Sequence, residues 1–321
     1  MRIYNHRAKE QGLGLTLKYR IKDQVRKRGE IYRGEGFYSW IGYADDLAVT
    51  ATCKEELQLA ANLLSELLTT FGLVINIDKT KSMIMNFQGV TYPESIITIN
   101  NAAIENVENF VYLGSLINNN HPGIDDHEIG RRIGMAVSKF ASMKAVLCNY
   151  KLKLNIRVRF YEVYVRTRLT YCSEIWSLTQ AQMNHIEASH IKFIRNLVRG
   201  GMARISSRKE IKDAKAKAKN GDSSDLENIN WAYRHTNKQI MSIVKTPKLC
   251  EYINKQNHRW VAHICRQDNH AVTKQLMFPD EISTRIGGRP NTVLENVLKY
   301  QYDVKFKSPE VFFRECYDRK I

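Results

Sequence analysis

The feature that most constrains the fold is a change of hydrophobic period near Asn118. Upstream of this point, short apolar runs are separated by turn residues, and such runs predict β-strands. We expect strands over residues 37–42, 47–52, 73–77, 82–87, 96–99 and 110–117. Two helices are also predicted, one over 11–28 and one from Thr52 to Gly72, the second opened by the capping pair Thr52 and Glu55. The first 118 residues therefore mix α and β structure.

Downstream of Asn118, apolar residues recur at intervals of three and four, which is typical of amphipathic helices. The three clearest stripes are Ile129, Ile133, Ala136, Phe140, Met143 and Leu147; Leu154, Val158, Tyr161, Val165 and Leu169; and Met183, Ile186, His190, Phe193 and Leu197. A lysine-rich run over 209–219 and a further helical portion follow. The sequence thus predicts an α+β fold in three regions: 1–118, 119–200 and 201–321.

The charge balance of the chain predicts a polyanionic partner. The 321 residues carry a formal net charge of +16, and a field of that sign attracts phosphate backbones. No run is apolar enough to span a membrane, and residues 1–9 are too polar for the core of a signal peptide. The six cysteines are scattered without a CxxC pair. These features predict an intracellular protein, nuclear or cytoplasmic, without disulfides.

Two adjacent carboxylates fall at the tip of a predicted hairpin, in the tetrapeptide Tyr43-Ala44-Asp45-Asp46. Like charges repel at this range unless a cation lies beside them. A divalent ion such as Mg²⁺ suits carboxylate oxygens and can also hold the phosphates of a nucleotide. The alternative is a solvated turn, where aspartate is common because it bonds to its own backbone. Both interpretations stay open on these residues alone.

Three motifs occur in order along the first region: Tyr43-Ala44-Asp45-Asp46, the stretch from Gly72 to Met83 that contains Asp78-Lys79-Thr80, and Phe110-Val-Tyr-Leu-Gly-Ser-Leu-Ile117. Together, at these spacings, they resemble the later palm motifs of a non-LTR (LINE-type) retrotransposon reverse transcriptase. The downstream stretches 169–179, 259–266 and 288–290 also resemble that family. The resemblance covers nearly the whole chain from about residue 12.

The resemblance implies a role for individual residues. Asp45 and Asp46 match the metal-binding pair, Lys79 matches a lysine near the incoming dNTP, and Tyr112 and Gly114 match the hairpin that grips the primer. The implied cofactor is Mg²⁺ (or Mn²⁺), and the implied partners are an RNA template and a DNA primer or target. The implied architecture is the second half of a palm over 1–118, a helical thumb over 119–200 and a basic helical C-terminal region.

One expected ligand is missing. The family places a third aspartate on an earlier strand, but the only acids before Asp45 here are Glu10, Asp23, Glu30 and Glu35, none in that context. We therefore expect the chain alone not to extend a primer. A non-catalytic nucleic-acid-binding protein and a decayed element fragment are the alternatives.

Basic residues on the predicted helices are candidates for contacts with nucleic acid. They are Arg157, Arg159, Arg166, Lys192, Arg195 and Arg199. The aromatic residues Tyr161, Tyr164, Tyr171 and Trp176 lie between or beside them, and arginine combined with aromatic surface suits phosphates and stacked bases.

A zinc site among His258, His263, Cys265 and His270 is a weaker alternative, because the closely spaced ligand pairs of such sites are absent. We expect His263 and Cys265 to be packing residues on a helix.

Overall fold

The computed structural model describes residues 1–23, 30–85, 96–119, 126–199, 208–219, 236–268 and 270–277. These residues form two compact units. The first unit contains Met1–Glu128, Glu174–Ser177 and the described chain from Gln256 onward, and the second contains the described parts of Ile129–Ser173 and Leu178–Lys255. The predicted boundary after residue 118 is near the end of the first segment. The region predicted over 201–321 is divided between the two units.

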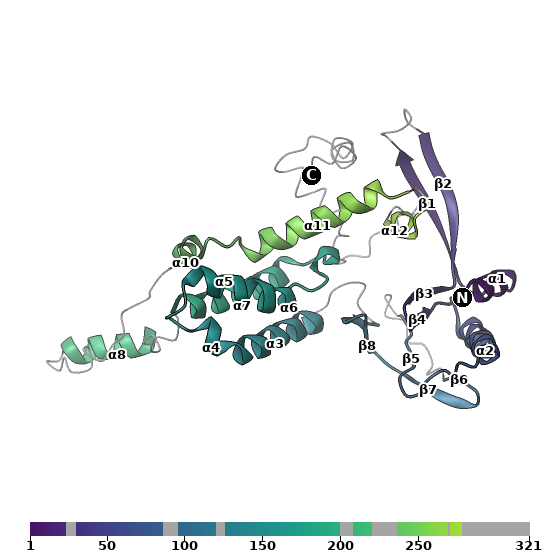
Figure 1. Cartoon of the computed structure of the whole chain (residues 1–321), viewed down its shortest axis with the longest axis horizontal. Coiled ribbons are helices and arrows are strands. Elements are labelled where there is room, and N and C mark those ends of the chain that lie inside the picture. The colour runs from purple at the N-terminus through teal and green to yellow at the C-terminus, as the bar shows by residue number, and fades with distance from the viewer. Residues whose placement is uncertain are drawn as a thin grey trace. The chain divides into compact units, whose positions relative to one another are not determined.

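The first unit mixes helices with antiparallel hairpins, one of which gains a third strand by parallel pairing (Figure 1). Its elements are α1 (Arg2–Glu10), β1 (Leu15–Asp23), β2 (Glu30–Tyr38), β3 (Trp40–Tyr43), β4 (Asp46–Val49), α2 (Lys54–Thr70), β5 (Lys81–Ser82), β6 (Ile97–Ile99), β7 (Ala102–Asn106), β8 (Asn109–Tyr112), β9 (Ser115–Asn118), the 3₁₀ turn η2 (Ser173–Ile175) and α12 (Val272–Met277). The first residue of η2, Ser173, belongs to the second unit.

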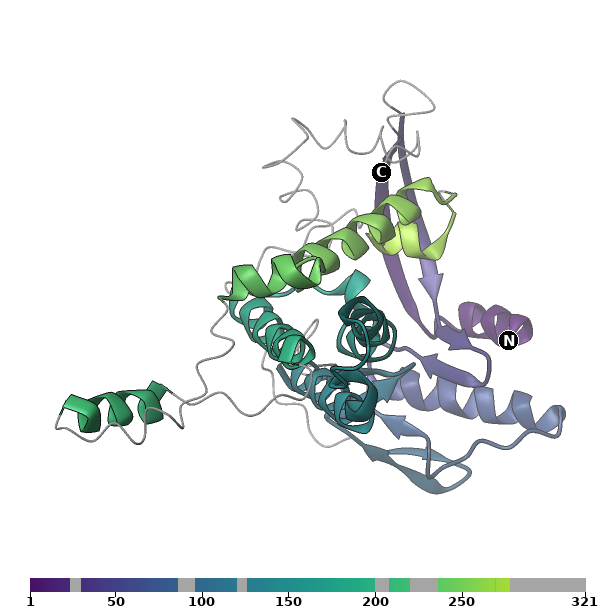
Figure 2. The same cartoon turned by 60° about the vertical axis from the view of Figure 1, so that its left-hand side comes forward.

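The described elements of the second unit are all helical (Figure 2). They are α3 (Asp126–Ser142), α4 (Lys144–Leu147), α5 (Leu154–Tyr161), the π-helical turn η1 (Glu162–Arg166), α6 (Thr167–Leu169), α7 (Gln180–Arg199), α8 (Arg208–Lys219), α10 (Asn237–Val244) and α11 (Leu249–Arg266). Residues 126–128 of α3 and residues 256–266 of α11, the larger part of that helix, belong to the first unit.

The N-terminal hairpin corrects a sequence prediction. Residues 15–23 form strand β1 and pair with β2 in a nine-residue antiparallel ladder, where a helix over 11–28 was expected. Leu13, Leu17 and Ile21 recur every four residues, but Thr16, Tyr19 and Ile21 also belong to the β-branched and aromatic types that favour strands. Pairing with β2 decides between the two conformations, and that partner lies outside any local window.

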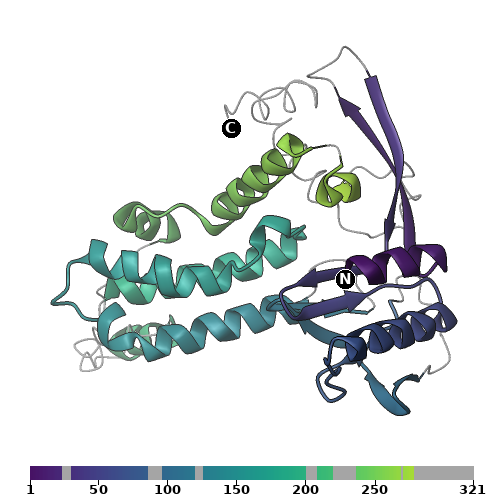
Figure 3. The same cartoon turned by 45° about the vertical axis from the view of Figure 1, so that its right-hand side comes forward.

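Helix α2 is the centre of the first unit, with α1 beside it (Figure 3). One face of α2 packs with α1 in a core of Tyr4, Ala8, Leu13, Ala60, Leu63, Leu64 and Leu67. Ala61 of α2 instead joins Ile97, Ile99 and Ile104 of the β6–β7 hairpin. Ile75 packs against both clusters. The hairpins are therefore attached to the unit through buried apolar side chains, each worth roughly 1.5–3 kcal/mol for the larger aliphatic residues.

The ends of α2 partly follow the prediction. Glu56, and not Glu55, accepts hydrogen bonds from the Thr52 backbone N–H at 2.9 Å and from its hydroxyl at 2.6 Å. These bonds hold the pKa of Glu56 below its usual value. Gly72, with φ +70°, follows the helix end as expected, and the Leu73 N–H donates to the Leu68 carbonyl at 3.0 Å.

The sequence predicted the turn of the β6–β7 hairpin but not that of the β8–β9 hairpin. Asn100 and Asn101 both have positive φ and join β6 to β7, which confirms the predicted turn. Leu113 and Gly114 also both have positive φ, so the single strand expected over 110–117 is the hairpin β8–β9. Residues 73–77 form no strand, and of the stretch 82–87 only Ser82 lies in one, while residues 86 and 87 lie outside the described chain.

The helical stripes of the second unit are confirmed at most positions. The first predicted stripe is buried at Ile129, Ala136, Phe140 and Leu147. The second is buried except at Leu154, and the third except at Met183. Phe140 and Phe193 stack with ring centroids 5.1 Å apart. The predicted capping pair Thr179 and Gln182 is also formed, with reciprocal bonds of 3.0 and 3.3 Å.

Described residues after Gln256 complete the first unit. Helix α12 lies beside β1, and the Tyr38 hydroxyl donates to Gln275 Oε1 at 2.6 Å. The buried ammonium of Lys274 donates to the carbonyls of Cys265 and Gln267 at 2.9 and 3.0 Å, where α11 ends. A cation at that position satisfies carbonyls that the helix leaves unpaired. No helix among the described residues has the length and apolar character needed to cross a bilayer.

Candidate functional site

The hairpin β3–β4 presents the acidic pair at its tip, as the sequence predicts. Tyr43 pairs with Asp46, so Ala44 and Asp45 form a two-residue loop. At the base, Trp40 pairs with Val49, and both side chains pack against the core of α1 and α2. The opposite face carries Ile41, Tyr43 and Asp46, and Tyr43 is 68% exposed. The hairpin is thus fixed at one end and open to solvent at the other.

Asp45 and Asp46 are both exposed. Neither carboxylate forms a hydrogen bond or an ion pair with any residue that the structure describes. Asp45 is the second residue of the loop and Asp46 the first of β4, so the two are sequence neighbours on a tight turn. Two hard oxygen donors that are open to solvent can bind a divalent cation, and such an ion would relieve their mutual repulsion.

The loop residue Ala44 adopts φ +54°, a left-handed conformation that costs an L-residue roughly 1–2 kcal/mol. We expect Ala44→Gly to raise the free energy of unfolding by up to about 1 kcal/mol, because glycine removes this strain. The matched change Ala48→Gly, in the middle of β4, should instead lower it by about 0.5–1 kcal/mol. Urea denaturation of both variants checks the prediction, and a loss of stability in both would contradict it.

Lys79 lies in the turn between α2 and β5. Its backbone N–H donates to Asn76 Oδ1 at 3.1 Å, and its side chain is exposed. Ile75, four residues earlier, packs against both core clusters and so anchors this segment within the unit. No hydrogen bond or ion pair within the described chain joins Lys79 to Asp45 or Asp46. The role of Lys79 beside a dNTP stays a prediction.

The other acids before Asp45 do not complete a metal site. Asp23 pairs with Glu30 at the far end of the β1–β2 ladder, about 27 Å along the strands from Leu15 and Tyr38. Glu10 ends α1 and lies 3.3 Å from His6 Nε2, and Glu35 pairs with Lys18 within the ladder. Within the described ranges, no three side chains among His, Cys, Asp and Glu form a group that could hold a metal ion. Among these described residues, Asp45 and Asp46 are two neighbouring carboxylates with no third candidate ligand grouped beside them.

Tyr112 and Gly114 lie at the tip of β8–β9, where Tyr112 pairs with Ser115 across the loop. The hairpin is joined to the start of α3 by a hydrogen bond of 3.3 Å from the Leu116 N–H to the buried carboxylate of Glu128. Gly114, with φ +82°, is exposed at this tip. This geometry makes the loop accessible, and its contact with a primer stays a prediction.

The prediction that Arg157 contacts nucleic acid is wrong, because its side chain is buried. The side chain is only 6% exposed and donates to the carbonyls of Leu152, at 3.2 Å, and of Leu197 near the end of α7. Burial lowers the pKa of this guanidinium. Arg157 thus joins α5 to α7 and is not available to a phosphate.

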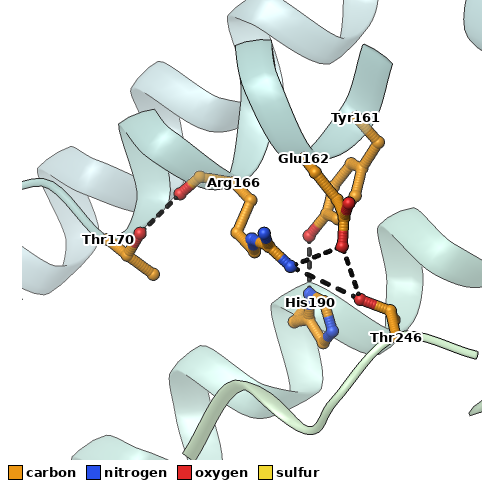
Figure 4. Close-up of polar contacts among 6 residues, drawn as sticks. All are labelled: Tyr161, Glu162, Arg166, Thr170, His190 and Thr246. Atoms are coloured by element: carbon orange, nitrogen blue, oxygen red, sulfur yellow. Dashed lines mark hydrogen bonds and ion pairs between the residues drawn. The ribbon is translucent and has the colours of Figure 1, made fainter. Parts of the chain in front are cut away.

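Arg166 is also engaged inside the second unit (Figure 4). Its guanidinium is 14% exposed, donates to Glu162 Oε1 at 2.7 Å, and lies 4.5 Å from the centroid of the Tyr252 ring. The Thr246 hydroxyl donates to the same carboxylate oxygen at 3.0 Å. This network ties the π-helical turn to the segment before α11. The guanidinium of Arg166 is thus already engaged by Glu162, and its contact with nucleic acid stays a prediction.

The remaining predicted cations differ in their surroundings. Arg159 and Lys192 are exposed, and Arg195 is half-buried with Nη2 2.7 Å from Asn237 Oδ1. The side chain of Arg199 lies outside what the structure describes. Of the four aromatic residues, Tyr164 and Tyr171 are exposed, whereas Tyr161 and Trp176 are buried and cannot stack on a base.

Sequence reasoning missed two cations of α3. Arg132 lies over the Tyr171 ring at 4.5 Å from its centroid, and Lys139 lies over the Tyr164 ring at 5.6 Å. Both pairs belong to residues 129–173, which contain ten lysines and arginines and one acid, Glu162. This local excess of basic over acidic residues can be counted from the sequence, and it would have made the cations of α3 candidates for nucleic-acid binding.

The zinc alternative finds no support in the described part of the chain, where no ligand cluster occurs. Cys265 is buried and confirms its predicted role in packing. His263, also predicted to be a packing residue, is instead exposed, and its Nε2 lies 3.2 Å from the Gln267 side-chain nitrogen.

Comparison with known proteins gives one informative result. No protein-family model matches the chain, and no solved structure matches it. It is 25% identical over 228 residues to an uncharacterized transposon-derived protein of Caenorhabditis elegans, a match that covers 70% of this chain and 71% of that protein. The similarity suggests a transposable-element origin. It does not indicate which of the proteins encoded by such elements the chain derives from.

Proposed function

We propose that this chain carries late palm strands, a helical thumb and a C-terminal region of a reverse transcriptase from a non-LTR retrotransposon. The observation that carries the proposal is the β3–β4 hairpin, whose tip holds two adjacent exposed carboxylates, Asp45 and Asp46. The similarity to a transposon-derived protein supports the same origin.

The parent activity is RNA-directed DNA synthesis from dNTPs. When bound, Mg²⁺ ions would stabilise the attacking 3′-oxygen of a primer and the leaving pyrophosphate. Asp45 and Asp46 would be ligands of these ions, and Lys79 would neutralise charge on the leaving group. RNA template and DNA primer are the proposed partners.

The donor set fits one weakly held ion and not a pair. Two carboxylates are present and a third ligand is absent from the described residues. We therefore propose that the chain by itself binds a divalent cation at Asp45 and Asp46 but does not extend a primer.

Manganese binding and primer extension test this directly. We expect the wild-type chain to bind Mn²⁺ and the double variant Asp45→Asn/Asp46→Asn to bind it at least roughly tenfold more weakly, because both charged ligands are removed. Titration followed by electron paramagnetic resonance measures the affinity. Neither protein should incorporate dNTPs on an RNA template with a DNA primer.

A second pair of adjacent acids supplies the control. Glu55 is exposed and Glu56 is half-buried, and Glu55→Gln/Glu56→Gln should leave Mn²⁺ affinity unchanged. Equal Mn²⁺ binding by wild type and the Asp45→Asn/Asp46→Asn variant would refute the metal role. Template-dependent incorporation that Asp45→Ala abolishes would refute the need for a third carboxylate.

The second candidate function is nucleic-acid binding without catalysis. The observation that favours it is the excess of ten basic residues over one acid in residues 129–173. Such a protein would bind RNA or DNA equally well with Asp45→Ala as without it. A decayed element fragment, by contrast, would show neither cooperative unfolding nor salt-dependent binding.

A further inference from the structure

The outer face of the α5–η1–α6 helix exposes a row of apolar and aromatic side chains. We call this set the aromatic face: Ile156, Phe160, Val163, Tyr164 and Tyr171. Phe160 on α5 is 36% exposed, and Tyr171, two residues beyond the end of α6, is 45% exposed. Exposed aromatic residues that gather along one helix and the turn after it form a patch of the kind that marks a contact site.

The rings of the aromatic face are held in fixed orientations. Phe160 and Tyr164 stack with an interplanar angle of 18° and centroids 5.9 Å apart. Lys139 and Arg132, two helical turns apart on α3, lie over Tyr164 and Tyr171 respectively. Arg132 is only 3% exposed, so it orients the Tyr171 ring from within the unit, and of these two cations only Lys139 reaches the surface beside the rings.

We propose that the aromatic face binds a single-stranded polynucleotide, with bases stacking on Phe160 and Tyr171 and phosphates meeting the basic side chains around them. Stacking on aromatic rings together with a positive surface is the common way in which proteins hold unpaired strands. The bases of a duplex stack on one another and do not offer their faces to a protein ring. The inference rests on the second candidate function, nucleic-acid binding, and names the surface and the kind of strand that it would bind; it does not depend on Asp45 or Asp46.

The local charge argues against the other occupants. Residues 129–173 carry ten basic side chains, of which Arg132 and Arg157 are buried and Arg166 is paired with the one acid, Glu162, so positive charge is in excess among those that remain. A second copy of the chain would bring like charges together on this face. Insertion of the rings into lipid would also carry the Lys139 ammonium, which lies on the Tyr164 ring, into an apolar medium. A flexible polyanion with planar bases satisfies both the charge and the rings.

Fluorescence anisotropy on the full chain tests the proposal, using mixed-sequence 20-nucleotide RNA and DNA strands and the matching duplexes. We expect Phe160→Ala/Tyr171→Ala to weaken binding of both single strands at least about tenfold, since each stacked base contributes substantially. Tyr150, which is 70% exposed in the same unit but lies outside the face, is the control, and Tyr150→Ala should leave affinity unchanged. Wild-type affinity should be higher for single strands than for duplex.

A second variant separates base stacking from hydrophobic contact. Phe160→Leu/Tyr171→Leu keeps apolar bulk and removes both rings, so it should weaken single-strand binding about as much as the alanine pair. Full affinity in the leucine variant, or in the alanine variant, would overturn the proposal. Tighter binding to duplex would overturn the assignment to single strands. Binding of anionic phosphatidylglycerol vesicles that is lost with alanine but retained with leucine, alongside unchanged oligonucleotide affinity, would assign the face to membrane instead.

Discussion

Replacing Arg157 by alanine should lower the free energy of unfolding by about 2–4 kcal/mol. The same change at Arg159, only two positions along α5, should leave it within about 0.5 kcal/mol of wild type. The two arginines look alike in the sequence, and both were candidates for binding phosphate. The structure gives them opposite roles, because Arg157 is buried and Arg159 is exposed.

The loss of stability in Arg157→Ala comes from two backbone carbonyls that would lose their hydrogen-bond donor. Its guanidinium donates to Leu197, near the carboxyl end of α7, and to Leu152, just before α5. Both acceptors lie where helical hydrogen bonding does not provide a partner, and alanine would leave them without the charged donor. Arg157→Met separates this effect from packing, since methionine restores much of the lost side-chain volume but donates no hydrogen bond. We expect it to remain destabilised.

Arg157→Ala should lose more stability than Arg159→Ala in a denaturant titration. Arg159→Ala should instead be the variant whose oligonucleotide binding changes. Arg157→Ala should shift the urea midpoint without changing the slope of the transition. Arg159→Ala should keep the midpoint and reduce the dependence of log affinity on log salt by about one unit, as expected for one lost phosphate contact. An unchanged midpoint in Arg157→Ala, with weakened binding, would show that the guanidinium faces nucleic acid after all.

The burial of Arg157 illustrates what sequence periodicity can and cannot reveal. The stripe Val158, Tyr161, Val165 and Leu169 was correctly predicted to be buried. Arg157 lies four residues before Tyr161, so it falls at the edge of that stripe, and this spacing was a usable signal. What the sequence does not show is that α7 ends beside it and supplies the carbonyl of Leu197. That neighbour lies forty positions away.

The same distinction explains the first unit. The hairpin tip at Asp45 was predictable because a two-residue loop between strands is a local pattern. Strand β1 was not, because residues 15–23 fit a helical period as well and only pairing with β2 excludes it. The position of Lys79 depends on how the segment after α2 is anchored by Ile75, which no local pattern encodes. Local turn chemistry thus fixed the candidate carboxylates, and long-range packing decided what surrounds them.

Acidification from pH 6.5 to pH 4 should cost the second unit about 3 kcal/mol of stability through His190 alone. His190 is fully buried on α7, where its Nδ1 lies 2.6 Å from the Tyr161 hydroxyl (Figure 4). Burial, and secondarily the positive charge of Arg166, lower its pKa from 6.5 to about 4. Burial also raises the pKa of Tyr161, so the hydroxyl stays protonated beside the ring.

The free energy of unfolding falls as the pH falls wherever the unfolded chain binds more protons than the folded chain. Above pH 6.5 the imidazole is neutral in both the folded and the unfolded chain, so it adds no pH dependence there. Between the unfolded pKa of 6.5 and the folded pKa of about 4, the unfolded chain takes up a proton that the folded chain refuses. Stability is therefore lost progressively over this window as the pH falls, and the loss is complete below about pH 4.

Urea denaturation at several pH values between 4 and 7 measures this loss when wild type is compared with His190→Asn. Asparagine can still accept a hydrogen bond from Tyr161 and does not titrate, so the variant should lose about 3 kcal/mol less than wild type across the window. His185→Asn, an exposed position on the same helix, is the matched control and should follow the wild-type curve. Parallel curves for wild type and His190→Asn would show that the ring takes up its proton while folded. Burial would then not lower the pKa of His190, and the predicted loss of stability through this residue would be wrong.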